Sequence, residues 1–315
     1  MRVSRARIAV AVAGAAFLFA VVLAALRVGE AAGKLSDWQA LILGVTQGAT
    51  ELLPVSSSGH LILVPWAAGW TYLADHPDFN KTFDVALHLG TLVAVVIYFW
   101  SDVVRLIRAW LGSVRRRSIQ TDDERVAWFV AVATVPAAIA GAAGENFVEE
   151  RLGQPWQIAI LLAVFAILLW IADHVPQRKD ISEIGWRGAV VLGLAQCLAL
   201  MPGVSRSGVT ITAGRFMQLD RDGAARLSFL LLIPIVFGAS LLKGVKDVAF
   251  GGLPPGSAGP FVVGMITAAV VGLVAIWGLL AYVRRHTYGL FVVYRLALAA
   301  AILVTIAAGW RDKNF

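Results

Sequence analysis

A carboxylate, a hydroxyl and an imidazole lie close together in the stretch "ELLPVSSSGHLILV", residues 51 to 64. Glu51, Ser57 and His60 carry groups that bind cations, attack electrophiles and transfer protons. The stretch is flanked by apolar runs, and the 315-residue chain is 59% hydrophobic and 15% charged, with a mean hydropathy of +0.76. This composition is typical of a polytopic helical membrane protein. Because ionisable side chains are costly in hydrocarbon, their presence here predicts a functional site.

A second polar stretch, "MPGVSRSGVTIT" beginning at Met201, repeats the first. At a constant offset of 149, residues 40–62 and 189–211 share nine identities in 23 positions, including the pattern V-S-x-S-G. We infer an internal repeat in which Ser57 of the first copy corresponds to Arg206 of the second.

Both stretches predict helices that are broken inside the membrane. The apolar regions 39–70 and 188–217 are each cut by proline, glycine and serine into halves of about 15 residues, which are short for a full crossing. A helix that begins at the serines after each break leaves its first N–H groups unpaired, and with the helix dipole these groups favour an anion. Each region is therefore expected to form a re-entrant hairpin with an anion site at its break.

Seven further stretches are long and apolar enough to cross a bilayer, and three of them lie between the two hairpins. An odd number of crossings inverts the second copy relative to the first. We therefore expect an all-α polytopic membrane protein with an inverted-topology repeat, two re-entrant hairpins, six core transmembrane helices and an extra N-terminal segment. The seven stretches are 8–26, 84–100, 126–144, 156–173, 227–243, 261–282 and 289–308.

Charge supports this topology. Most arginines fall in segments that the count places inside the cell, including the loop between 84–100 and 126–144, as the positive-inside rule expects. The net charge of +7 is thereby explained without a nucleic-acid partner. Residues 1–37 are expected to be an anchor or a signal-like segment, and 38–310 a single membrane domain with repeats at about 38–173 and 187–310.

Inverted hairpins would bring the two breaks together near the middle of the membrane. Gln47 and Glu51 are four residues apart on one helical face, and a guanidinium at Arg206 matches a phosphate bidentately. A carboxylate near a phosphate requires a cation or a proton between them. We expect the Arg206 side chain to lie within ~10 Å of the Ser57 hydroxyl, since a phosphate contacted by both needs heavy-atom contacts of ~3 Å on each side.

Simpler readings remain open for each residue. Serines after a proline are often helix caps, and His60 could be a hydrogen-bonded histidine with no catalytic role. Arg206 and Glu51 could form a structural ion pair, and Gln47 could link two helices.

The two motifs resemble those of the bacterial undecaprenyl-diphosphate phosphatases of the bacitracin-resistance type. "GVTQGATELLPVSSSGHLIL" carries the first motif, with Gln47 at the first acidic position of the family pattern, and "MPGVSRSGVT" carries the second. "FDVALHLGTLVAVVIYF" at 83–99 also resembles a family segment, and the similarity covers about residues 38–310.

The resemblance implies an integral-membrane hydrolase that removes the terminal phosphate of undecaprenyl diphosphate. It implies lipid-carrier recycling for peptidoglycan synthesis, bacitracin resistance, a divalent cation such as Mg²⁺ or Ca²⁺, and a site open to the extracytoplasmic side of the inner membrane. A homodimer is left open. Glu51, Ser57, His60 and Arg206 fall on catalytic positions, and Gln47 and Glu51 on metal-binding positions. The expected substrate-binding residues are Ser56, Ser58, Ser205, Arg206, Ser207 and Thr210.

A transporter or flippase for an anionic isoprenoid lipid is the alternative, because inverted repeats with broken helices are also a transporter architecture. A transporter has no need of a serine and a histidine placed for chemistry.

Overall fold

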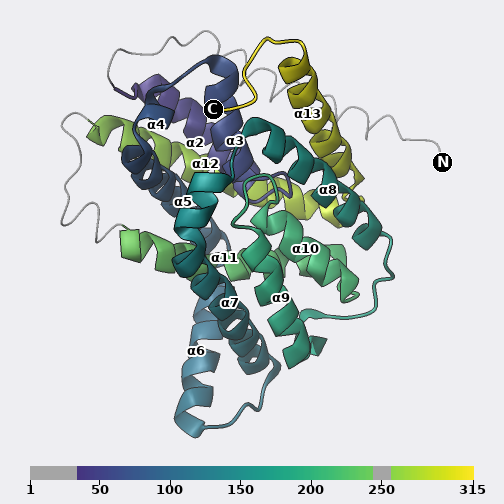
Figure 1. Cartoon of the computed structure of the whole chain (residues 1–315). Helices are drawn as coiled ribbons and strands as arrows, with labels where there is room; N and C mark the ends of the chain where they lie inside the picture. The colour runs from purple at the N-terminus through teal and green to yellow at the C-terminus, as the bar shows by residue number, and fades with distance from the viewer. Residues whose placement is uncertain (1–33, 244–256) are drawn as a thin grey trace.

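The computed structural model describes residues 34–243 and 257–315, and in these ranges it is helical without a β-strand (Figure 1). In chain order the elements are α2 (Asp37–Glu51), α3 (Ser57–Ala68), α4 (Tyr72–Asp75), α5 (Pro77–Tyr98), α6 (Trp100–Arg116), α7 (Asp122–Arg151), α8 (Pro155–Asp173), the 3-10 turn η1 (Ile181–Glu183), α9 (Trp186–Leu198), α10 (Arg206–Phe216), α11 (Arg221–Lys243), α12 (Ala258–Val283) and α13 (Gly289–Ala307).

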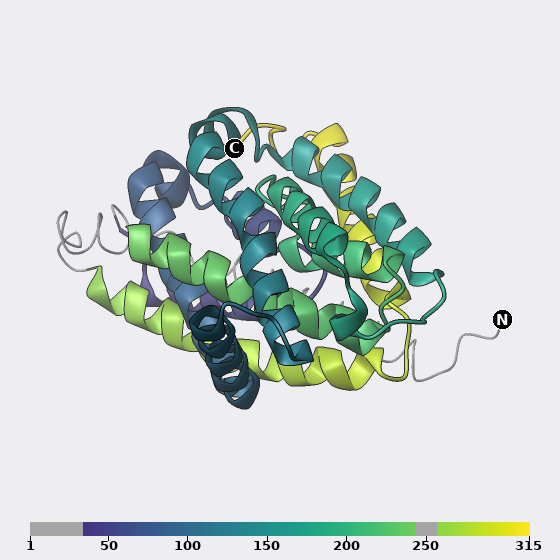
Figure 2. The ribbon, with the colours of Figure 1, turned by 90° about the horizontal axis from the view of Figure 1, so that it is seen from below.

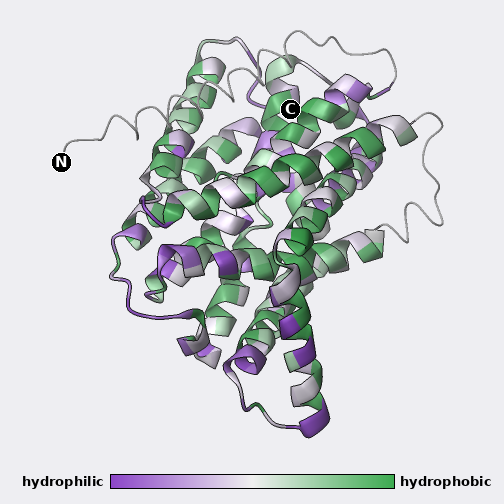
Figure 3. Ribbon diagram, turned by 180° about the vertical axis from the view of Figure 1, so that it is seen from behind, coloured by the Kyte–Doolittle hydropathy of each residue, from purple (hydrophilic) through white to green (hydrophobic). Residues whose placement is uncertain are grey.

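Six helices of the described ranges are long and apolar enough to cross a membrane, namely α5, α7, α8, α11, α12 and α13. They correspond to six of the seven predicted spans, and this part of the prediction is confirmed. The seventh, 8–26, lies outside the described residues. The ribbon coloured by hydropathy is largely green along the helices and purple at the tip that joins α6 to α7 (Figure 3).

The two interrupted regions form pairs of short helices, as predicted. The lengths of α2, α3, α9 and α10 are 15, 12, 13 and 11 residues. At each break one serine has a positive φ, 77° at Ser56 and 75° at Ser205, and these two serines occupy the same repeat position. Each is the N-cap of the helix that follows, so the cap reading of these serines is confirmed.

The segment that carries Arg105 and Arg108 differs from the expected loop, because residues 100–116 form the helix α6. Val103, Leu106 and Trp110 recur at helical spacing and pack against the beginning of α7, where Trp110 contacts the ring of Trp128. Figure 1 shows α6 and this part of α7 projecting together from the bundle.

Equivalent helices of the two copies make equivalent contacts, each with a helix of the other copy. The first short helix of each copy packs against a span of the other copy, α2 against α12 and α9 against α7. The pairs α5–α12 and α11–α7 exchange in the same manner, whereas α8 packs directly against its counterpart α13 (Figures 1 and 2). The two halves are therefore interleaved.

Small residues allow the close approach of α2 to α12. A Cβ added to Gly44 would lie 2.6 Å from the carbonyl oxygen of Gly264, and one added to Gly48 would lie 2.7 Å from that of Ala268. Glycine spaced by four residues lets helix backbones meet in membrane proteins. This contact fixes the helix that carries Gln47 and Glu51.

The glycine contact predicts a stability difference. In Gly48→Leu the new side chain meets α12 backbone, and overpacking costs about 1–3 kcal/mol or more, so we expect the apparent Tm in detergent to fall by more than about 5 °C. Gly278→Leu is the matched control on α12, where no atom of the described residues lies within 4 Å of an added Cβ. Equal Tm values for the two variants would contradict the close packing of α2 on α12.

Candidate functional site

Glu51 is the centre of the candidate site. It is the last residue of α2, is only 5% exposed, and accepts hydrogen bonds from side chains on three elements. The Ser57 hydroxyl at the start of α3 donates to Glu51 Oε2, and Gln47 Nε2 donates to the same oxygen at 3.3 Å. The predicted Gln47, Glu51 and Ser57 therefore form one cluster at the first break.

Arg206, the first residue of α10, joins this cluster from the second helix pair. Its Nη2 donates to Glu51 Oε1 at 3.2 Å, and its Nη1 donates to the carbonyl oxygen of Ser228 on α11 at 2.8 Å. Ser57 and Arg206 thus bind the two oxygens of one carboxylate, which confirms that their side chains lie within reach of one ligand. The Nε of Arg206 is buried and has no hydrogen-bond partner among the described residues.

The two breaks are joined to each other by hydrogen bonds. Ser56 Oγ accepts a hydrogen bond from Gly203 N at 3.0 Å, and Ser207 Oγ donates to the carbonyl oxygen of Leu53 at 2.8 Å. The predicted meeting of the breaks is therefore confirmed. Irregular backbone between apolar helices satisfies its polar groups with other protein groups here.

Two helix N-termini face the cluster. The cap hydroxyls of Ser56 and Ser205 accept from the third residues of α3 and α10, Gly59 at 3.4 Å and Gly208 at 3.0 Å. The N–H groups of the first two residues of each helix are not the ones that these caps accept. Helix starts of this kind favour an anion.

His60 lies one turn after Ser57 but hydrogen-bonds to other groups. Its Nδ1 is 2.6 Å from the carbonyl oxygen of Ser56, and its Nε2 is 2.5 Å from the hydroxyl of Tyr294 on α13. A carbonyl only accepts hydrogen bonds, so Nδ1 carries a proton, and Nε2 of the neutral ring accepts from Tyr294. Nε2 is therefore the basic nitrogen of His60.

The remaining predicted residues form hydrogen bonds around the start of α10 or lie at the start of α3. Ser205 Oγ lies 3.2 Å from Ser207 Oγ. Thr210 Oγ1 donates to Ser228 Oγ at 2.8 Å and lies within hydrogen-bond distance of two carbonyls of its own helix. Ser58 is half-buried in the first turn of α3.

Three residues near the breaks escaped the sequence analysis: His88, Tyr294 and Arg295. His88 Nε2 on α5 lies 3.5 Å from Glu51 Oε2. Arg295 is fully buried and donates to carbonyl oxygens of both breaks, those of Pro54, Gly203 and Val204. Polar side chains in apolar spans were the available signal, because such residues in a membrane usually have a function or a partner.

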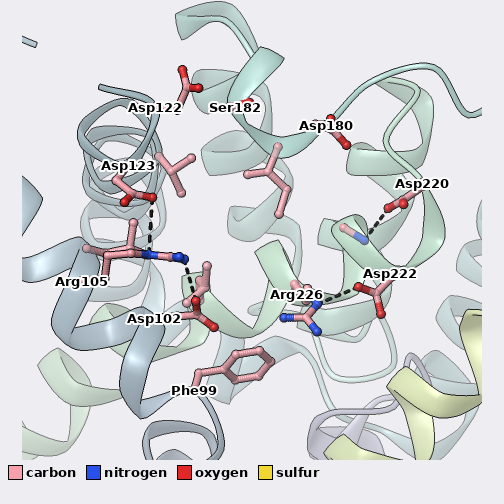
Figure 4. Close-up of a pocket in the computed structure, with 15 residues that line it drawn as sticks. Phe99, Asp102, Arg105, Asp122, Asp123, Asp180, Ser182, Asp220, Asp222 and Arg226 are labelled. Carbon is pink, nitrogen blue, oxygen red and sulfur yellow. Dashed lines mark hydrogen bonds and ion pairs between the residues drawn. The ribbon is translucent and has the colours of Figure 1, made fainter. Parts of the chain in front are cut away.

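A pocket of about 350 Å³ lies apart from this cluster, between α6, η1 and the beginnings of α7 and α11 (Figure 4). Its carboxylates are engaged by the protein: Arg105 pairs with Asp102 at 2.6 Å, and Arg226 pairs with Asp222 at 2.7 Å. No predicted site residue lines it. We interpret this pocket as an ion-paired contact between helix ends.

Comparison with known proteins agrees with the motifs. Residues 40–301 match the family described as "Bacitracin resistance protein BacA". A protein of Desulforudis audaxviator named undecaprenyl-diphosphatase is 44% identical over 272 residues, covering 86% of this chain and 98% of that protein. A Geobacter sulfurreducens protein of the same name is 46% identical over 271 residues, covering 85% of this chain and 98% of its own length. With the family pattern matched over most of the chain, and relatives aligned over nearly their whole length, this protein belongs to the bacitracin resistance protein BacA family.

Proposed function

We propose that this chain is an integral-membrane hydrolase that removes the terminal phosphate of undecaprenyl diphosphate. The relatives reported above carry the name undecaprenyl-diphosphatase. One observation carries the proposal: the buried carboxylate of Glu51 binds both the hydroxyl of Ser57 and the guanidinium of Arg206. The product, undecaprenyl phosphate, would return to peptidoglycan synthesis, and abundant enzyme would raise bacitracin resistance.

Arg206 and the helix starts would hold the diphosphate. The buried Nε–H of Arg206 lacks a partner in the described part of the chain, and an unpaired buried donor is costly unless a ligand accepts from it. A phosphate oxygen suits this guanidinium group, and the N–H groups at the starts of α3 and α10 add donors. Ser56, Ser58, Ser205, Ser207 and Thr210 would shape and support this anion site.

Ser57 would be the nucleophile. As Ser57 Oγ bonds to the terminal phosphorus, the bond from that phosphorus to the bridging oxygen breaks, and the Ser57 proton passes to Glu51 Oε2. The bridging oxygen leaves on undecaprenyl phosphate. Glu51 suits the role of base because it already accepts the Ser57 O–H bond.

His60 would serve the second step. Water attacks the phosphoserine phosphorus and gives a proton to the Tyr294 hydroxyl, which passes its own proton to Nε2 of His60. The bond to Ser57 Oγ breaks, Glu51 returns its proton to that oxygen, and His60 afterwards releases its proton to solvent. Tyr294 orients the imidazole through its hydroxyl, 2.5 Å from Nε2.

The residues around Glu51 fit a divalent cation. Gln47 Oε1 is buried without a hydrogen-bond partner among the described residues, and carboxylate and amide oxygens are ligands of Mg²⁺ and Ca²⁺. Glu51, while ionised in the substrate complex, and Gln47 would hold the ion. Bound there, it would neutralise charge on the diphosphate as a Lewis acid.

We further propose that the two copies are inverted repeats, that both helix pairs are re-entrant, and that the site opens to the extracytoplasmic side of the inner membrane. The exchange of contacts between copies, α2–α12 with α9–α7, supports a two-fold relation. The arginine distribution along the chain supports the orientation.

Transport of an anionic isoprenoid lipid is the second candidate, because interleaved repeats with broken helices also suit alternating access. Purified protein in detergent separates the two activities, since transport needs two compartments and hydrolysis does not. We expect phosphate release from undecaprenyl diphosphate under these conditions. An intact protein that releases none there would contradict the proposed hydrolase.

Loss of the nucleophile should abolish turnover. In Ser57→Ala we expect phosphate release to fall at least about 10³-fold, because removal of a catalytic nucleophile has effects of this order or larger. Thr134→Val is the control: it removes a hydroxyl from α7 that, among the described residues, bonds only the carbonyl of Val130. Substantial activity in Ser57→Ala would remove Ser57 from the chemistry.

Loss of the imidazole should slow turnover without loss of fold. In His60→Ala we expect phosphate release to fall at least about a hundredfold, since acid–base groups contribute roughly 10²–10⁴-fold. In acid-quenched reactions with substrate labelled in the terminal phosphate, label should accumulate on Ser57. Near-full activity of His60→Ala would exclude His60 from the mechanism.

A further inference from the structure

We propose that His88 is a third protein ligand of the divalent-cation site, together with Glu51 Oε2 and the amide oxygen of Gln47. The inference rests on the cation role in the proposed function and adds to it a nitrogen ligand and a preference among metals. It is carried by the contacts of His88, by the groups gathered at one carboxylate oxygen, and by an unpaired buried oxygen.

His88 presents one ring nitrogen to Glu51 in a fixed tautomer. Its Nδ1 lies 2.7 Å from the carbonyl oxygen of Asp84, one turn earlier on α5. Because a carbonyl only accepts, Nδ1 carries the proton, and in the neutral ring Nε2 has a free lone pair. Histidines that bind metals usually donate their other N–H to a carbonyl or carboxylate in this way.

The separation of 3.5 Å between His88 Nε2 and Glu51 Oε2 suits a shared ion better than a hydrogen bond. Strong N–H···O bonds are about 2.7–3.2 Å long. Two ligands that each lie about 2.0–2.2 Å from one metal ion are roughly 3–4 Å apart at ordinary coordination angles.

Three side chains from three helices lie around Glu51 Oε2: Gln47 of α2, Ser57 of α3 and His88 of α5. Gln47 Nε2 lies 3.3 Å from Glu51 Oε2, and Ser57 donates to it, whereas Arg206 binds the other oxygen. The buried Oε1 of Gln47 has no partner in the described part of the chain, and a cation would supply one. In the described ranges no three histidine, cysteine or acidic side chains form a metal site, so an amide oxygen is needed as the third ligand.

A nitrogen ligand changes which ion is preferred. Oxygen-only sites suit Mg²⁺ and Ca²⁺, whereas imidazole favours transition metals, so the site should bind Mn²⁺ more tightly than Mg²⁺. His88 is 30% exposed and Glu51 5%, so the imidazole lies on the more open side of the carboxylate.

The test is Mn²⁺ binding to the full chain, purified in detergent without a histidine tag. Electron paramagnetic resonance titration gives the affinity, and pulsed measurements detect a nitrogen-14 nucleus bound to the ion. We expect a nitrogen signal in the unaltered protein. In His88→Gln the signal should disappear and the affinity for Mn²⁺ should fall at least about tenfold. Even the loss of a residue that only hydrogen-bonds to a metal ligand lowers metal affinity by about 10–100-fold.

Two further variants make the result specific. His174→Gln is the control, because His174 also bonds the carbonyl four residues earlier, that of Trp170 at 2.7 Å, but is exposed. It should keep signal and affinity. His88→Glu should restore binding without the nitrogen signal and raise the relative affinity for Mg²⁺, which loss of fold would not do.

The outcomes separate this inference from the proposed function. Bound Mn²⁺ without nitrogen coupling, a coupling that persists in His88→Gln, or unchanged affinity in that variant would overturn the ligand role of His88. Phosphate release that survives complete chelation would overturn it as well, while leaving the hydrolase intact. Absence of phosphate release from a protein that binds Mn²⁺ through His88 would contradict the hydrolase alone.

Discussion

The architecture depends on one constraint: backbone polar groups at a break in an apolar helix need partners from the protein. Here each break supplies partners to the other, through Ser56 with Gly203 and Ser207 with Leu53. Arg295 adds hydrogen bonds of 2.9–3.2 Å to carbonyl oxygens of both breaks and of Leu162. Unpaired carbonyls in such surroundings cost several kcal/mol each by the general rule for lipid-embedded backbone. The breaks are therefore held together, and Glu51 and Arg206 with them.

The contacts between the two breaks explain how a buried ion pair forms between the two helix pairs. Removing charges from water is expensive, and an Arg–Glu pair in isolation adds little to stability. Glu51 and Arg206 nevertheless form an ion pair of 3.2 Å between the two helix pairs. Among the described residues, one guanidinium nitrogen and one amide oxygen nearby lack partners. The arrangement is thus incomplete as a structural network, which supports the proposed binding of an anion and a cation.

The sequence allowed a large part of this structure to be predicted. Three predicted features follow from hydrophobic length, proline–glycine breaks and a repeat offset of 149. They are the six apolar spans, the two broken helix pairs, and the approach of Ser57 and Arg206 to one site, where both bind Glu51. These features depend on local pattern or on symmetry, and both can be read from a single chain.

The features that could not be predicted depend on contacts between residues far apart in the sequence. His88 and Arg295 lie within apolar spans, and only packing shows that they reach Glu51 and the breaks. The partner of His60 could not be foreseen either, because Tyr294 is 234 residues away. Residues 100–116 form helix α6 instead of the predicted basic loop, because Leu106 and Trp110 lie at helical spacing among the arginines and pack against α7.

The central claim is that one diphosphate contacts both hairpins. A structure of the protein with a non-hydrolysable isoprenoid methylenediphosphonate tests it most directly. The account predicts that the terminal phosphonate contacts the Arg206 guanidinium and the Ser57 hydroxyl together, beside Glu51. A headgroup that contacts only one hairpin, or that lies away from the breaks, would contradict it.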